Sequence, residues 1–432
     1  MSEHTIGASG SRTPPARLVV LMITAFIDMV GLLMVIPILP FYAKSLGAGG
    51  LVVGLLVSSF AIAQLVSAPI WGRFSDRYGR RPALLVGLTA AAIAYVVFAF
   101  ADSLWLLFLS RIVQGAGGGT VSVIQAYVAD ATRPEDRAKS LGWLSAATNA
   151  GVALGPVLGG LSMGIGRHAP GLVAAALCLL NILFASRFLV ESRAAGDLAA
   201  ARATGSTAGG RSREAVGRVV SHPGEPPSRL IWIYAIAMGA FQGVNSMLAL
   251  LLADRFGVTA RTIGYFYTYI GVISVLTRAG VLGPMVDRFG EARLSRYGSI
   301  LLATGLGSLA FIFPIRDPAA VAAMLGGALP AQVVAVLPFL PLAIAVALLP
   351  LGTAFTFPCV TALLSRVIPQ QERGLYMGVQ QTFGGMARVA FPIFFGLAYD
   401  RINGAPFLIG AALVASTLWI GAGMEGWAKG EG

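Results

Sequence analysis

Long apolar runs recur along almost the whole chain, and each is about as long as a helix that crosses a membrane. A hydrocarbon core of about 30 Å requires roughly 20 residues, because each helical residue adds 1.5 Å and lipid offers no partner to a free backbone group. The sequence therefore predicts an all-α membrane protein with twelve spans, at residues 18–40, 51–71, 82–101, 104–128, 140–162, 170–190, 230–252, 262–284, 294–314, 335–364, 374–397 and 404–424.

Composition excludes several other classes of protein. Charged residues make up 12% of the 432 residues, about half the share in a soluble domain, which speaks against a water-soluble enzyme. Cys178 and Cys359 both lie in apolar stretches, so a secreted disulfide framework is excluded. The net charge of +12 does not indicate a nucleic-acid partner, because the basic residues stand between apolar runs, as in membrane proteins.

The distribution of basic residues predicts the orientation. Loops on one side of the first half contain Lys44 and Arg167, whereas the other side collects Arg12, Arg17, Arg73, Arg77, Arg80, Arg81, Arg133, Arg137 and Lys139. The positive-inside rule then places both termini in the cytoplasm. The first run is about twice as long as a signal-peptide core, so we expect it to be retained as a span. We expect a monomer in a bacterial inner membrane.

The chain divides into two similar halves. Residues 193–229 are rich in Ala, Gly, Ser and Arg and are interpreted as a flexible cytoplasmic linker between six-helix bundles at 1–192 and 230–432. One motif of the first half, Asp76-Arg77-Tyr78-Gly79, recurs 211 residues later as Asp287-Arg288-Phe289-Gly290. Four further residues recur 236 residues later: Arg137, Gly142, Pro156 and Gly160 correspond to Arg373, Gly378, Pro392 and Gly396. The difference between the two offsets indicates an insertion in the second half, around Pro318 to Gln332. Duplicated halves are a known plan for transporters.

A glycine- and arginine-rich loop follows the second span at residues 72–81. It resembles the signature loop of the major facilitator superfamily, and this resemblance implies a conformational latch made of Gly72, Asp76, Arg77, Gly79, Arg80 and Arg81. Asp130, at the end of the fourth span, is the candidate acid for pairing with the arginines. In the second copy Glu291 and Ala292 replace two arginines, so we expect a weaker latch there. The alternative is a basic cluster that only determines topology.

Two further motifs carry the same resemblance. Arg111, Gln114 and Gly115 match the superfamily's fourth-span pattern, in which the arginine is thought to assist proton transfer; the alternative is an arginine that caps carbonyls of a bent helix. The fifth span contains the motif of the superfamily's antiporters, with Gly151, Gly155, Pro156, Gly159 and Gly160. Glycines at every fourth position form a groove for another helix, and packing without exchange specificity is the alternative. The counterpart around Ala387, Phe391 and Phe395 has lost most of the glycines.

Asp28 is the acid that lies deepest in the predicted membrane. It stands about ten residues into the first span, hence roughly 15 Å from the surface. A lone carboxylate is costly to ionise there, so its charge should depend on what occupies the cavity. With Gly31 and Pro37 it resembles the start of the tetracycline-efflux group of twelve-span exporters. The alternative is a structural Asp28 bonded to a neighbouring helix.

Several polar and aromatic residues within the spans are candidates for lining a substrate cavity. They are Gln64, Gln125, Gln242, Asn245, Tyr265, Tyr269, Gln380 and Gln381, together with two intramembrane cations, Arg278 and Arg388. Either arginine could bind an anionic substrate, although Arg278 could instead anchor the cytoplasmic end of its span. Residue type alone does not say which of these side chains face inward.

The expected function is proton-coupled antiport of a small amphipathic compound or drug by alternating access. Asp28 and Arg111 would couple protons, and the 72–81 loop would hold the outward-facing state. The first alternative is a facilitator or symporter for a sugar or organic anion, using Arg278 and Arg388. A non-transporting receptor is the second, but a folded sensor domain is absent from the sequence. No nucleotide-binding loop, metal cluster or nucleophile–base arrangement is recognisable, so we expect no cofactor and no enzyme activity.

Overall fold

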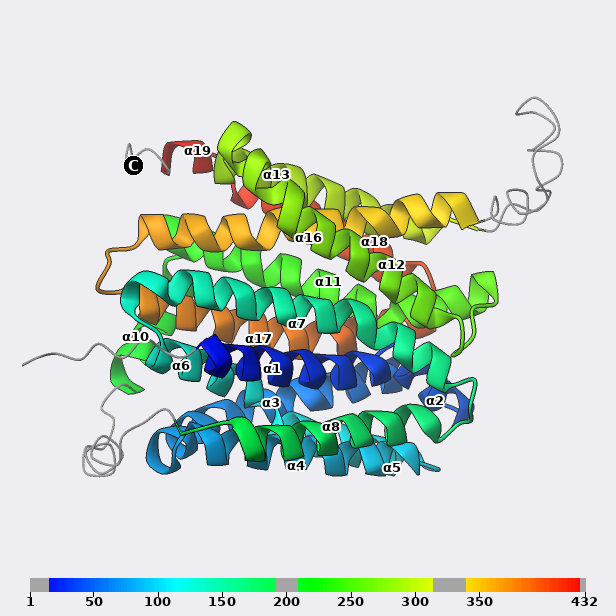
Figure 1. The fold of residues 1–432 in the computed structure, drawn as a ribbon. Coiled ribbons are helices and arrows are strands. Elements are labelled where there is room, and N and C mark those ends of the chain that lie inside the picture. Colours follow the sequence, from blue (N-terminus) through cyan, green and yellow to red (C-terminus); the bar gives the residue numbers. More distant parts are fainter. Residues whose placement is uncertain (1–14, 192–208, 314–338, 428–432) are drawn as a thin grey trace, which may run out of the picture.

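The computed structural model describes residues 15–191, 209–313 and 339–427, and all regular secondary structure in these ranges is helical. The first half contains α1 (Pro15–Val35), α2 (Leu39–Ser45), α3 (Gly50–Tyr78), α4 (Arg80–Ala99), α5 (Leu104–Gly117), α6 (Thr120–Ala131), α7 (Pro134–Ser162) and α8 (Ala169–Phe188). The second contains α11 (Pro226–Phe256), α12 (Ile263–Leu276), η1 (Thr277–Val281), α13 (Leu282–Phe311), α16 (Leu340–Val367), α17 (Arg373–Arg401), α18 (Ala405–Ile420) and α19 (Met424–Trp427). Figure 1 shows the long helices side by side, running in the same general direction.

The twelve predicted spans are confirmed by these helices. Ten helical stretches of the described chain are long and apolar enough to cross a membrane, and α18 is a shorter apolar helix. One of the ten, Ile263–Phe311, contains two predicted spans, because Gly290 interrupts α13 with a φ of 73°. Gly79, its counterpart in the repeat, separates α3 from α4 with a φ of 103°. A positive φ favours glycine, so in both halves a glycine with a positive φ makes the turn between the two spans.

The predicted linker differs in part from expectation. Residues 209–221 form a helix, α10 (Gly209–Ser221), and are therefore not a flexible coil. Ala215 and Val219 are four residues apart on one face, where they are buried in a cluster with Leu230 and Ile231 of α11. Two apolar residues on one face are too few to predict an amphipathic helix from this Gly- and Arg-rich sequence. Residues 192–208 and the predicted insertion at Pro318–Gln332 lie outside the described ranges.

The glycine groove of α7 is occupied by α1. A methyl group placed on Gly151 would lie 2.6 Å from the carbonyl oxygen of Phe26, and one on Gly155 would lie 2.8 Å from that of Val30. A methyl group on Gly159 would likewise collide with the backbone of Met34. The three glycines therefore let the α1 backbone lie directly against α7, on both sides of Asp28 in the sequence.

The second half also packs two helices closely, but there the small residues lie on the other helix of the pair. There the glycines lie on α11, where methyl groups on Gly239 and Gly243 would come within 2.6 Å and 2.7 Å of the rings of Phe391 and Phe395 on α17. The loss of glycine from the second copy of the motif is thus compensated on the partner helix. As expected, α7 has the glycine groove and its counterpart α17 does not, but close helix packing occurs in both halves.

Helices α7 and α3 join the halves. A methyl group on Gly160 of α7 would lie 2.8 Å from the carbonyl oxygen of Arg261, just before α12, and one on Gly271 of α12 would lie 2.8 Å from Cα of Ala153. Similarly, a methyl group on Gly50 of α3 would lie 2.7 Å from the carbonyl oxygen of Gly396 on α17. The antiporter motif therefore packs one face of α7 on α1 and another on the opposite half.

The packing of α7 on α1 can be tested with two alanines on the same helix. Gly155→Ala should destabilise the protein by about 1–3 kcal/mol, the usual cost of overpacking, because the new methyl group meets the backbone of α1. Gly142→Ala is the matched control, since no atom lies within 4 Å of a methyl group at that position. Thermal unfolding of the purified variants in detergent measures the effect, and equal melting temperatures for the two would contradict this account of the groove.

Candidate functional site

The fourth span is broken in the middle of the bundle. Helix α5 ends at Gly117 and α6 begins at Thr120, so carbonyl groups at the end of α5 lose their helical partners. Side chains of α3 donate to carbonyls at the end of α5 and in the interruption itself: Ser67 to Gly115 at 3.3 Å, the Trp71 indole N–H to Ala116, and Gln64 to Gly118 at 3.3 Å. Because lipid cannot satisfy a free carbonyl, these donors make the break tolerable.

The break places the start of α6 against Asp28. Thr120, the first residue of α6, donates its hydroxyl hydrogen to Oδ2 of Asp28 at 2.8 Å. Asp28 is 7% exposed, and its only ion pair or hydrogen bond in the described chain is this one to Thr120. A helix N-terminus carries partial positive charge, so the start of α6 is a favourable neighbour for the carboxylate. Asp28 is thus hydrogen-bonded to a neighbouring helix, as the structural alternative expected, but it also lines a cavity.

Arg111 is buried and forms no ion pair with any residue that the structure describes. It is 2% exposed, and its guanidinium carbon lies 5.7 Å from the ring centroid of Phe98. Its Nε and Nη2 atoms have no hydrogen-bond partner in the described chain, and neither does Oε1 of Gln114. Within the described ranges the donors to carbonyls of the broken helix come from α3, and no hydrogen bond from Arg111 to them is found. Arg111 and Gln114 are left with bonding capacity beside an open space.

These residues line one cavity between the halves, with a volume of about 310 Å³. The first half contributes Asp28, Arg111 and Gln114, together with Gln64 and Tyr95. The second contributes Met238 and Gln242 of α11 and Arg388 of α17. Apolar side chains, including Ile36, Leu39, Val57 and Phe60, form much of the remaining wall. The cavity thus offers one acid, two cations and several amides in a mainly apolar setting, which suits a small amphipathic molecule.

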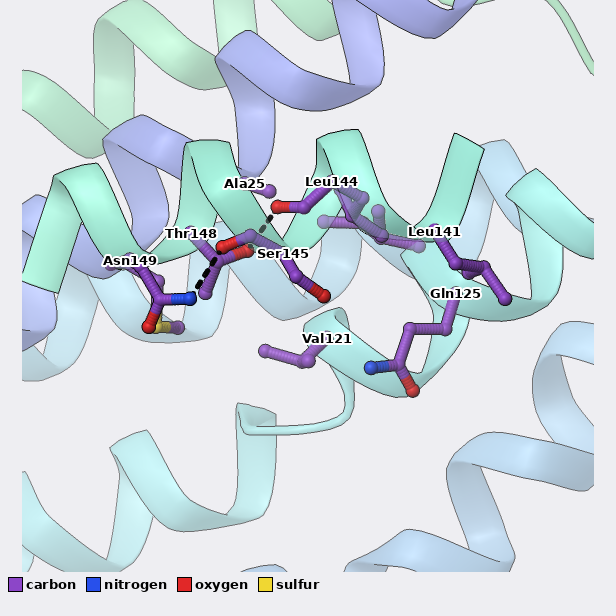
Figure 2. A pocket seen from close by; sticks show the side chains of 10 residues that line it. Ala25, Val121, Gln125, Leu141, Leu144, Ser145, Thr148 and Asn149 are labelled. Atoms are coloured by element: carbon purple, nitrogen blue, oxygen red, sulfur yellow. Dashed lines mark hydrogen bonds between the residues drawn. The ribbon is translucent and has the colours of Figure 1, made fainter. Parts of the chain in front are cut away.

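Two hollows adjoin this cavity. One, of about 590 Å³, lies between α3, α6 and α17 and shares Gln64, Val121 and Arg388 with it. The other, of about 460 Å³, lies between α1, α6 and α7 and shares Met29 and Val121. In Figure 2, Gln125 of α6 lies across this second hollow from Ser145 of α7, while Thr148 and Asn149 bond to carbonyls of their own helix. Both hollows extend the central cavity along α6.

The predicted lining residues divide into three groups. Gln64, Gln242 and Arg388 line the central cavity, and Gln125 and Gln381 line the adjoining hollows. Three others line none of these spaces. Gln380 is buried and accepts a hydrogen bond from Thr361, the backbone carbonyl of Asn245 accepts one from Tyr267, and Arg278 bonds to Ser274 in its own helical turn. Tyr265 and Tyr269 are 64% and 39% exposed on the outer face of α12 that also carries Val272 and Leu276. Neither tyrosine lines the central cavity or its two hollows, and residue type does not give the rotational phase of a helix.

Comparison with known proteins identifies the family. Residues 21–328 match the model described as Major Facilitator Superfamily.

The chain belongs to the major facilitator superfamily.

The chain is 30% identical over 403 residues to the class C tetracycline resistance protein of Escherichia coli, covering 92% of this chain and 94% of that protein. It is 26% identical to multidrug resistance protein 2 of Bacillus subtilis, covering 90% of each. The crystal structure of the nucleoside transporter NupG matches with a TM-score of 0.72 at 15% identity, over 94% of this chain and 98% of that one. This likeness shows the fold. The predicted resemblance to the drug–proton antiporter group is confirmed, and the protein is a multi-pass membrane transporter.

The superfamily's signature loop forms a network centred on Arg80. Its Nε lies 2.9 Å from Oδ2 of Asp130, the predicted partner, and its Nη1 lies 3.0 Å from Oδ1 of Asp76. Glu191 accepts the backbone N–H groups of Arg80 and Arg81, at 2.9 Å and 3.0 Å, and so caps the start of α4. The loop is thus held together within the first half. Glu191 was not among the predicted latch residues, because it follows α8, about 110 residues further along the chain.

The remaining residues of the signature loop surround this network. The guanidinium carbon of Arg77 lies 5.6 Å from the ring centroid of Tyr78. Gly79 makes the turn into α4, and a side chain there would collide with Glu191. Gly72 faces open space, so the structure gives no packing reason for a glycine at that position.

The second copy of the loop retains an ion pair with its charges exchanged. Glu291 occupies the position equivalent to Arg80, and Arg366 the position equivalent to Asp130, at the same offsets of 211 and 236 residues. Arg366 Nη2 pairs with Glu291 Oε1. The replacement of arginine by Glu291 therefore inverts the contact and does not remove it. The expected weaker latch was based on the loss of two arginines, whereas an ion pair of reversed polarity is present at this position.

At the opposite end of the bundle, side chains bind the halves to each other. Asp400, at the end of α17, accepts the N–H groups of Gly50 at 2.6 Å and Leu51 at 2.8 Å, and thereby caps the N-terminus of α3. Lys44 of α2 forms an ion pair with Asp254 of α11, which also accepts the Tyr399 hydroxyl at 2.8 Å. This end is at the right of Figure 1, where α2 lies, away from α6 and α10.

The Asp400 cap should stabilise the closed state of this end. Asp400→Ala removes both acceptors, and loss of an N-terminal cap costs about 1 kcal/mol, equivalent to about a fivefold shift of the equilibrium towards separation. Electron–electron distance measurements between spin labels at Ser45 and Ile402 should show a larger population of long distances. Asp102→Ala is the control, because this exposed acid lies in the short connection between α4 and α5 within one half. An unchanged distribution in the Asp400 variant would refute the cap's role.

Proposed function

We propose that this transporter is a proton-coupled antiporter that exports a small amphipathic compound from a bacterial cell, across the inner membrane. The observation that carries the proposal is the position of Asp28: it is the one carboxylate that lines the central cavity in the described chain. The names of the relatives, tetracycline resistance protein and multidrug resistance protein, support a drug as the exported compound. Their bacterial origin supports the location.

Asp28 has the chemistry that exchange requires. A carboxylate in a cavity of low polarity is stabilised by either a proton or a cationic group of the cargo, and the two compete for the same charge. Thr120 holds one carboxylate oxygen from α6, so the acid keeps its position when its charge changes. Arg111, on the same cavity wall, would assist the movement of the proton.

The arrangement of the halves supports alternating access. Asp400, Lys44 and Asp254 hold the halves together at the end that the positive-inside rule predicts to be external. The hollow between α3, α6 and α17 extends the cavity towards the other end. With that orientation the cavity receives cargo from the cytoplasm. The signature loop centred on Arg80 would then stabilise the opposite, outward-facing state.

The alternative of a facilitator or symporter differs in its dependence on the proton gradient. Arg388 lines the cavity and would suit an organic anion. A facilitator continues to equilibrate its cargo after a protonophore collapses the gradient, whereas an antiporter stops accumulating it. The same vesicle measurement therefore separates the two functions.

The exchange mechanism predicts the effect of removing the carboxylate. In everted vesicles with an acidified interior, Asp28→Asn should reduce the accumulation of tetracycline or ethidium at least tenfold, because the amide cannot exchange a proton. Asp102→Asn is the control, since this acid is exposed and outside the cavity. Equal surface expression and melting temperature show that the variants are folded. Undiminished gradient-driven accumulation by the Asp28 variant would remove this residue from the mechanism.

A further inference from the structure

The charges that line the central cavity do not balance. In the described chain the cavity and its two hollows are lined by one carboxylate, Asp28, and two guanidinium groups, Arg111 and Arg388. Neither arginine forms an ion pair within the described ranges. A cargo that offered only a cationic group to Asp28 would leave both arginines uncompensated, at a cost in a setting of low polarity.

Arg388 is the better placed of the two arginines to meet a cargo. It lines both the central cavity and the hollow between α3, α6 and α17, so it borders the route as well as the site. Its one hydrogen bond in the described chain runs from Nε to the carbonyl of Gly384, one turn away in α17, at 3.3 Å. The two terminal nitrogens of the guanidinium remain for a ligand, and this planar group pairs well with a carboxylate.

We propose that Arg388 is an anion-binding residue of the cargo site, and that the preferred cargo is a zwitterionic amphipathic compound whose acidic group meets Arg388 while its cationic group meets Asp28. This inference rests on the proposed export function and assigns the class of cargo. Asp28 belongs to the first half and Arg388 to the second, so a bound zwitterion contacts both halves at once. Gln64 and Gln242 supply neutral polar groups on the same wall, and the apolar side chains receive the rest of the molecule.

The inference is tested with pairs of compounds that differ only in the acidic group. Amphipathic zwitterions such as norfloxacin are compared with their ethyl esters, in which the acid is masked and the amine remains. Binding is measured by fluorescence titration of the purified full-length protein in lipid nanodiscs. The native protein should bind the zwitterions at least tenfold more tightly than the esters. Arg388→Gln should abolish this preference by weakening zwitterion binding about tenfold, with little change for the esters.

Two variants control for structural effects. Arg278→Gln removes another arginine of the second half, one that bonds to Ser274 and lines none of the three spaces, and should retain the preference. Arg388→Lys keeps the charge and should restore part of it. If no zwitterion binds better than its ester, or if Arg388→Gln weakens both members of each pair equally, the inference is wrong.

A transport measurement separates this inference from the proposed function. Everted vesicles are energised, and the release of protons is followed on addition of a zwitterion, an ester or ethidium. Proton release with ethidium and the esters but without preference for zwitterions would overturn the assignment of Arg388 and leave proton-coupled export intact. Binding with the predicted preference but without any proton release would instead overturn antiport and leave the anion-binding residue standing.

Discussion

The break between α5 and α6 is the constraint on which the central cavity depends. Lipid cannot satisfy the carbonyl groups that a broken helix exposes, so Ser67, Trp71 and Gln64 of α3 donate to them. This satisfaction lets α6 start at Thr120, beside Asp28. A continuous fourth span would need none of these donors. The position of the acid and the polarity of the cavity wall therefore follow from one local interruption of a helix.

Close helix packing holds this arrangement in place, and the two halves achieve it differently. In the first half the glycines of α7 accept the backbone of α1, whereas in the second the glycines of α11 accept phenylalanine rings of α17. The signature loops show the same freedom, since Arg80–Asp130 in one half corresponds to Glu291–Arg366 in the other. In each case the contact between helices is retained while the residues that make it are exchanged. The repeat therefore preserves the contact between two positions more closely than the residue type at either position.

The two ends of the bundle are stabilised by different kinds of contact. At the end near α2, Asp400 and Lys44 reach across the boundary between the halves. At the other end, the Arg80 network and the Glu291–Arg366 pair each lie within one half. Contacts across the boundary must break when the halves move, whereas contacts within a half can persist. This asymmetry is what one of the two states of the proposed alternating-access cycle would show.

The sequence by itself determined the number of spans, the repeat, the family and the position of Asp28 along the first span, because these depend on the length and order of apolar runs and on local motifs. It also indicated Asp130 as the acid that pairs with the arginines of the signature loop. Only the tertiary structure decided that Arg388 faces the cavity while Tyr265 and Arg278 do not, that Glu191 caps α4, and that Asp400 binds α3. These contacts join residues far apart in the chain or depend on the rotation of a helix about its axis. Membrane spans that are apolar on all sides give little periodic signal of that rotation.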